Sequence, residues 1–148
     1  PDIEIIFKPD PGLPMFALDP EQMGRVFVNL IDNGIASIKE AASEMHGDSA
    51  GKEKLGTISL STAYDTELGI VSIYVADTGV GIAESDRERL FEPYFSKKKG
   101  GTGLGLSVVS TIVTDHQGFI RVRDNSPRGA TFVIELPVVS KVARRVNG

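Results

Sequence analysis

The spacing of apolar residues predicts two helices. Apolar side chains recur on one helical face from residue 20 to about residue 44, where Asp19 can cap the first turn and Pro20 suits the first helical position. The apolar segment from Leu104 to Asp115 predicts the second helix, with Gly118 as its C-terminal stop.

Period-two alternation and turn residues predict five or six short strands and one short helix. The expected strands are 3–7, 57–63, 70–76, 119–123 and 131–136, with 15–18 as a further candidate, and the short helix is expected at about 84–91. Because hairpins are frequent and alternating βαβ units are missing, we expect an α/β (α+β) two-layer sandwich. Its sheet is mixed and mostly antiparallel, and helices cover one face.

Length and composition favour a single domain. The 148 residues fit one core, which we assign to residues 1–137, followed by a C-terminal tail at 138–148. A net charge of −4 argues against a nucleic-acid or anionic-membrane binder. The chain has no cysteine and only two histidines, so disulfides, thiolate sites and multi-histidine metal sites are not expected. No apolar run approaches about 20 residues and the start lacks a signal-peptide pattern, so we expect no direct membrane contact.

Glycine is the unusual count: the chain has 16, and six of them lie between Gly79 and Gly105. Several nucleotide motifs are nevertheless excluded. No P-loop sequence occurs, and the glycine run 101–105 has the wrong spacing for a dinucleotide-binding fingerprint. The H-R-D and D-F-G motifs of eukaryotic-type protein kinases are missing. A different phosphate site must be considered.

Three polar or glycine-rich features could build such a site. Residues 101–106 run into a predicted helix whose N-terminus favours an anion, although a loop that merely caps the helix has the same pattern. Residues 77–82 follow a predicted strand. Asp77 could accept the exocyclic amino group of adenine, although Asp-x-Gly is also a common turn. Asn29 and Asn33 share one helical face, and their amide oxygens suit magnesium.

Taken in order, these segments resemble the ATP-binding domain of the GHKL superfamily, which includes gyrase B, Hsp90, MutL and the sensor histidine kinases. The likeness is greatest to the bacterial sensor histidine kinases and covers about residues 14–137. The matching motifs are NLIDN at 29–33 (N box), DTGVGI at 77–82 (G1 box), LFEPYF at 90–95 (F box), GTGLGL at 101–106 (G2 box) and GATF at 129–132. The resemblance implies the Bergerat ATP-binding fold.

The resemblance also implies roles for individual residues. Asn33 would coordinate a magnesium ion that bridges the ATP phosphates, Asn29 would assist it, and these two are the implied catalytic residues. Asp77 would bind the adenine amino group, and residues 83–101 would form the ATP lid, anchored by its phenylalanines. The implied ATP-binding residues are Asn29, Asn33, Asp77, Gly79, Gly81, Ile82, Phe91, Phe95, Lys98, Gly101, Thr102, Gly103, Leu104, Gly105, Leu106 and Thr131.

Two positions depart from the commonest kinase pattern. Gly34 stands where alanine usually follows the second asparagine, and Ala36 stands where many members have a lysine or arginine. The phosphate contact of that basic residue is therefore not carried over. Together with the F-box sequence, the variant at Ala36 looks like the nitrogen-regulation type of sensor kinase.

Neither histidine has the context of a phosphoacceptor. His46 lies in a predicted loop and His116 at a predicted helix end, whereas acceptors begin a long amphipathic helix with His-Glu or His-Asp. The resemblance therefore implies a histidine kinase catalytic domain that binds ATP and Mg²⁺ and phosphorylates a histidine on a separate dimerisation module of its parent. A cognate response regulator would be the other partner. The isolated domain would be a monomer, at the cytoplasmic end of a membrane-anchored sensor.

Two other functions use the same fold. An ATP-driven clamp of the Hsp90 or MutL type usually carries a water-activating glutamate at the position of Asn29, and asparagine cannot accept a proton. An anti-sigma kinase or a protein-binding module is the other alternative. The long phenylalanine-containing lid and the complete G2 box favour a sensor kinase.

Overall fold

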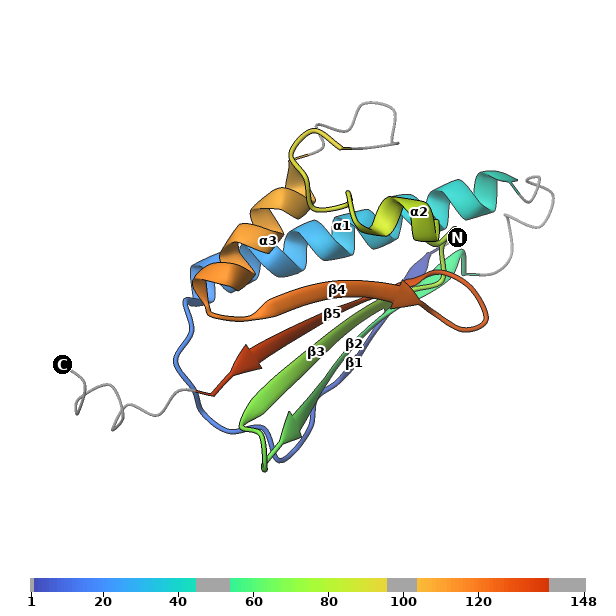
Figure 1. Cartoon of the computed structure of the whole chain (residues 1–148). Helices are drawn as coiled ribbons and strands as arrows, with labels where there is room; N and C mark the ends of the chain where they lie inside the picture. Colours follow the sequence, from blue (N-terminus) through green and yellow to red (C-terminus); the bar gives the residue numbers. More distant parts are fainter. Residues whose placement is uncertain (1, 45–53, 96–103, 139–148) are drawn as a thin grey trace, which may run out of the picture.

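The computed structural model describes residues 2–44, 54–95 and 104–138 (Figure 1). Among them the strands are β1 (Ile3–Lys8), β2 (Gly56–Asp65), β3 (Ile70–Asp77), β4 (Phe119–Asp124) and β5 (Ala130–Pro137). The helices are α1 (Pro20–Glu44), α2 (Glu84–Arg87) and α3 (Gly105–Asp115). The main strands and both long helices therefore lie where the apolar pattern predicts them.

The described elements form two layers. One layer is a five-stranded sheet with the order β1-β2-β3-β5-β4, and the helices cover one of its faces (Figure 1). Strand β1 pairs with β2 in parallel, and the other pairs are antiparallel. The predicted two-layer sandwich with a mixed, mostly antiparallel sheet is confirmed. Among the described residues, no helix combines the length and the apolar character needed to cross a bilayer.

Two local predictions were wrong. Residues 15–18 are not a strand: Met15 is 99% exposed and Phe16 packs against the core, so their pattern reflects one buried side chain instead of sheet pairing. The short helix α2 ends at Arg87, well before residue 91. Beyond it, the N–H groups of Arg89 and Glu92 bond to carbonyls three residues earlier, at 3.1 and 3.0 Å, and the chain continues as turns.

The core lies between the two long helices and the covered face of the sheet. In α1, the four-residue spacing of Val26, Leu30 and Ile38 places them inward at 1% exposure or less, and Gly34 completes the row. Each such aliphatic side chain stabilises the fold by roughly 1.5–3 kcal/mol. Because this row is buried, the residues beside it on α1 are held at a fixed position over the sheet.

The end of α3 involves the residue before Gly118, the predicted C-terminal stop. Gln117, with φ of 62°, adopts the left-handed conformation that commonly follows a helix. The N–H of Gly118 bonds to the carbonyl of Val113 at 2.9 Å, which closes the helix end. Glycine is needed at 118 for space instead, because a Cβ there would lie 2.5 Å from the carbonyl oxygen of Glu135 on β5.

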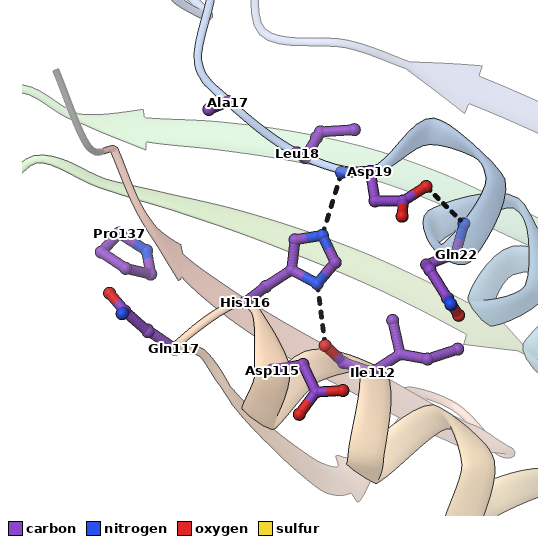
Figure 2. A pocket seen from close by; sticks show the side chains of 9 residues that line it. All are labelled: Ala17, Leu18, Asp19, Gln22, Ile112, Asp115, His116, Gln117 and Pro137. Atoms are coloured by element: carbon purple, nitrogen blue, oxygen red, sulfur yellow. Dashed lines mark hydrogen bonds between the residues drawn. The ribbon is translucent and has the colours of Figure 1, made fainter. Parts of the chain in front are cut away.

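His116 joins the end of α3 to the start of α1 (Figure 2). Its Nε2 accepts the N–H of Asp19 at 3.0 Å, and its Nδ1 lies 2.8 Å from the carbonyl oxygen of Ile112. Because Nε2 accepts, the ring proton is on Nδ1, and the neutral ring makes both bonds. The ring lines a cavity of about 520 Å³ that also contacts Pro137 at the end of β5. These contacts give His116 a structural role at the end of α3, where the sequence placed it.

Replacing His116 by alanine should lower the free energy of unfolding by about 1 kcal/mol, because the hydrogen bond to Asp19 that joins the helix ends and the bond to Ile112 within α3 are both lost. ATP binding should be unchanged, since Pro137 pairs with Ile70, at the opposite end of β3 from Asp77. Urea unfolding and titration calorimetry on the same preparation measure both quantities. Equal unfolding free energies would show that His116 does not hold these ends together.

Asp10 organises the turn that follows β1. Its Oδ1 accepts the N–H of Gly12 and its Oδ2 accepts the N–H of Tyr64 on β2, both at 2.8 Å. These N–H groups, that of Gly12 above all, hold the pKa of the Asp10 carboxyl below its ordinary value of 3.8. The charged form of Asp10 is therefore the one that the folded chain favours.

An Asp10→Asn variant should be less stable at neutral pH, because an amide offers only one oxygen to two N–H donors. Since the pKa is lowered on folding, the carboxylate contributes stability above pH about 4, and this contribution is lost as the pH falls through the lowered pKa. The difference in urea midpoint between the two chains should therefore be largest near pH 7 and shrink below pH about 4. A difference that stays constant down to pH 3 would contradict this.

Candidate functional site

Asp77 ends strand β3 and is buried, with 5% of its surface exposed. Its Oδ1 accepts the N–H of Gly79 at 2.8 Å and, more weakly, the N–H of Ala130 on β5 at 3.4 Å. The alternation along β3 places this side chain on the helix-covered face, in line with Val75. The carboxylate is thus held in one orientation, as a fixed acceptor for a ligand requires.

A polar row on α1 reaches this end of β3. Asn29, Asn33 and Ser37 follow one another at four-residue spacing and so lie along one side of the helix. The Oγ of Ser37 accepts the N–H of Val80 at 3.0 Å. A Cβ at Gly79 would lie only 2.1 Å from that Oγ, so glycine lets the turn after β3 approach the helix.

Gly34 brings α1 against Asp77. A Cβ at Gly34 would lie 3.4 Å from the Cβ of Asp77 and 3.2 Å from the Cδ1 of Ile58. An alanine would therefore fit only if Ile58 moved by a few tenths of an ångström. The departure from the commonest kinase pattern lies at the contact between the helix that carries Asn33 and the strand that carries Asp77.

Helix α3 begins beside Asn29. The Nδ2 of Asn29 donates to the carbonyl of Arg25 at 2.8 Å, and its Oδ1 would lie 2.9 Å from a Cβ at Gly105. Glycine at 105 therefore allows the first turn of α3 to approach α1. A helix N-terminus favours negative charge. The contact between Gly105 and Asn29 therefore places a site that favours anions beside the asparagine row.

The two F-box phenylalanines differ in their surroundings. Phe91 packs edge-on against Phe132 of β5, with ring centroids 6.3 Å apart and planes at 77°. The guanidinium of Arg89 lies over the ring of Phe95, 4.7 Å from its centroid. Phe91 therefore ties the segment after α2 to the sheet. Its role, and that of Phe95, as lid anchors stays a prediction.

Ala130, and not Thr131, contacts Asp77. Thr131 pairs with Ala76 of β3, and residues that pair across strands share a face, so Thr131 lies on the opposite face of the sheet from Asp77. The N–H of Ala130 bonds to the carboxylate instead. The ATP contact predicted for Thr131 is not supported by this pairing.

The remaining predicted site residues fall into two groups. Described ones are Gly81, which has φ of 79°, Ile82 and Leu106, which pack against the core, and Leu104, which directly precedes α3. Lys98, Gly101, Thr102 and Gly103 lie outside the described residues, as do residues 96–101 of the predicted lid and His46.

Sequence reasoning gave no site role to Ser37, Gly129 or Ala130, although the last two lie in the motif GATF at 129–132. Ser37 continues the four-residue spacing of the two asparagines, which could have identified it. Gly129 has φ of 103°, and a Cβ there would lie 1.9 Å from the carbonyl oxygen of Asp77. Gly129 and Ala130 lie more than fifty positions from Asp77, and the motif that contains them does not indicate which of its residues contacts Asp77.

The chemistry of these groups suits a nucleotide with a magnesium ion. The described part of the chain holds no cluster of three or more His, Asp or Glu side chains that could bind a metal. A metal here would need amide oxygens together with phosphate oxygens of the ligand, a ligand set that magnesium accepts. A fixed carboxylate can accept an N–H group of a base, and a helix N-terminus can bind phosphates. The amide oxygens of the asparagine row can bind the ion.

Comparison with known proteins points the same way. Residues 18–140 match the family model described as histidine kinase-, DNA gyrase B- and HSP90-like ATPase. The sensor histidine kinase ZraS of Salmonella typhimurium is 36% identical over 140 residues, which are 95% of this chain and 27% of ZraS. The sensory histidine kinase/phosphatase NtrB of Rhodobacter capsulatus is 36% identical over 89% of this chain and 36% of NtrB. These equal likenesses do not single out the nitrogen-regulation type.

Solved histidine kinase structures share the fold. Full-length ShkA, in complex with AMPPNP, matches with a TM-score of 0.74 and 27% identity over 93% of this chain and 26% of that one. The histidine kinase ThkA, in complex with the response regulator TrrA, matches with a TM-score of 0.70 and 25% identity over 93% of this chain and 34% of ThkA. The likeness thus covers nearly all of this chain and about a third or less of each of these kinases.

Proposed function

The chain belongs to the histidine kinase-, DNA gyrase B- and HSP90-like ATPase family, and from this membership we propose how its site works. It is an ATP-binding catalytic domain of the sensor histidine kinase type. The domain binds Mg-ATP between α1 and the segment that follows β3. It then donates the γ-phosphoryl group to a histidine on a separate dimerisation module of its parent.

The fixed carboxylate of Asp77 is the observation that carries this proposal. Asp77 is buried, is held by two backbone N–H groups and lies against the helix that carries Asn29 and Asn33. A carboxylate can accept the amino group of adenine but repels a base that presents only a carbonyl oxygen at the same position. The orientation of Asp77 therefore supports recognition of adenine over a base with a carbonyl oxygen in place of its amino group.

Phosphoryl transfer depends mainly on positioning and on electrostatic stabilisation of an in-line transfer. In our proposal Asp77 orients the base, and the N-terminus of α3 stabilises phosphate charge. Asn33 holds a magnesium ion, and Asn29 assists it. When bound, magnesium neutralises charge on the phosphates. Asn29 cannot accept a proton from water, so hydrolysis of ATP is slow in the absence of an acceptor.

The proposed partners follow from the relatives. The complex of ThkA with TrrA supports a response regulator as a partner of the parent protein. We propose that the phosphorylated histidine belongs to the dimerisation module: both ring nitrogens of His116 are engaged in the fold, and His46 lacks the sequence context of an acceptor. We place the domain in the cytoplasm, where ATP is available, at the end of a membrane-anchored sensor, and as a monomer when isolated.

Radiolabelled ATP tests the proposal. The chain alone should take up no acid-labile phosphate, because it supplies a donor site without an acceptor. Adding the histidine-bearing helical module of the parent, linked or in trans, should give transfer to that histidine. The control is the same module with its histidine replaced by alanine. Acid-labile label on the chain alone, lost in a His46→Ala or His116→Ala variant, would refute the separate acceptor.

A further inference from the structure

Three side chains from other elements donate to backbone carbonyls of the turn 77–82. The contacts run from Asn125 Nδ2 to the carbonyl oxygen of Asp77 (2.8 Å), from Arg128 Nε to that of Gly79 (3.1 Å) and from Arg87 Nη2 to that of Ile82 (3.4 Å). None of the three donors belongs to a motif that the sequence analysis identified. The third contact is long and therefore the weakest.

The donors are tied to one another. Asn125 and Arg128 lie on the β4–β5 turn, which the N–H of Asn125 closes by bonding to the carbonyl of Gly129 at 3.0 Å. Arg87, on α2, also forms an ion pair with Asp124, the last residue of β4. The β4–β5 turn therefore holds the carbonyl side of 77–82.

The N–H groups of the same turn are held from the other side. Those of Gly79 and Val80 donate to Asp77 Oδ1 and to Ser37 Oγ. The turn contains two glycines, whose backbone is the most permissive of any residue. Fixing it before a ligand arrives removes an ordering cost from binding and sets the direction of the carboxylate.

We propose that Asn125 and Arg128 are positioning residues that set the base specificity of the site. By holding the carbonyls of Asp77 and Gly79 they aim the Asp77 carboxylate at the base, and they do so without contacting the nucleotide. This inference rests on the proposed function, in which that carboxylate accepts the amino group of adenine.

A direct contact of Arg128 with phosphate is the competing explanation, and it has a different consequence. A phosphate contact is shared by all nucleoside triphosphates, so its loss would weaken ATP and inosine triphosphate equally. Loss of a positioning residue would instead weaken the part of the ATP affinity that depends on the base. The ratio of the two affinities separates these explanations.

The experiment is calorimetric titration of the chain with ATP and with inosine triphosphate, which carries oxygen in place of the adenine amino group. The variants are Asn125→Ala, Arg128→Ala and Arg128→Lys. Matched controls are Ser126→Ala on the same turn and Arg121→Ala on β4, whose side chain pairs with Glu135 away from the site. Thermal melting confirms that each variant is folded, and Arg128, which is exposed, provides the test if Asn125→Ala does not fold.

We expect the unchanged chain to prefer ATP and the preference to fall about 3- to 10-fold in Asn125→Ala and Arg128→Ala. Arg128→Lys should restore part of it, and both controls should keep all of it. An undiminished preference in the two alanine variants overturns the inference while leaving the proposed function intact. Equal binding of the two nucleotides by the unchanged chain overturns the proposed recognition of adenine by Asp77, and this inference with it.

Discussion

Replacing Asn33 by alanine should reduce phosphoryl transfer to the histidine module by at least about 100-fold, with saturating Mg-ATP present. In our proposal Asn33 supplies an amide oxygen to the magnesium ion, and loss of a group that stabilises charge in the transition state typically has an effect of this size. The measurement is the initial rate at which label passes from radiolabelled ATP to the module. Because the site also binds the base through Asp77, nucleotide affinity should fall much less than the rate.

Asp32→Ala is the matched control for this variant. Asp32 directly precedes Asn33 on α1 and is exposed, whereas Asn33 is half-buried in the row between Asn29 and Ser37. The control should keep its transfer rate, which separates loss of the metal ligand from a general effect on the helix. Asn33→Asp retains an oxygen ligand and should keep part of the rate. A full rate in Asn33→Ala would remove the metal role from our proposal.

The fold was predictable where local signals decide it. Helix α1 begins at Pro20 as predicted, because Asp19 caps it: the Oδ1 of Asp19 accepts the N–H groups of Glu21 and Gln22 at 3.0 and 3.1 Å. The strand order was not predictable in the same way. Placing β5 between β3 and β4, and β1 beside β2 in parallel, depends on pairing between distant segments. No period-two pattern records such pairing.

The candidate site was likewise predictable only where local signals determine it. Motifs of consecutive residues identified Asp77 and the two asparagines, because spacing within one strand end or one helix face is local. Ala130 and Asn125 were given no site role, because each contacts Asp77 from a segment distant in the sequence. Thr131 was chosen in place of its neighbour because a motif does not say which of two adjacent residues faces the helices. Only the register of β5 against β3 decides that.

Asp77→Asn should weaken ATP binding by about 1–3 kcal/mol, measured by calorimetry. The amide oxygen can take the place of Oδ1 and keep the bonds from Gly79 and Ala130, so the fold should survive. The other end of the side chain then becomes an NH₂ group. It would meet the adenine amino group donor to donor, where the carboxylate offered an acceptor.

Affinities of both chains for ATP and for inosine triphosphate form a thermodynamic cycle for this substitution. If Asp77 reads the amino group, the substitution should weaken ATP while leaving inosine triphosphate unchanged or binding it more tightly, because an NH₂ group can donate to its base oxygen. If Asp77 only stabilises the turn after β3, both nucleotides should weaken together, since the turn is the same for each. Asp115→Asn is the charge-matched control and should change neither affinity, because Asp115 is exposed at the end of α3, near Pro137, which pairs with the opposite end of β3 from Asp77. Equal losses for the two nucleotides would make Asp77 a structural carboxylate and require another group to recognise the base.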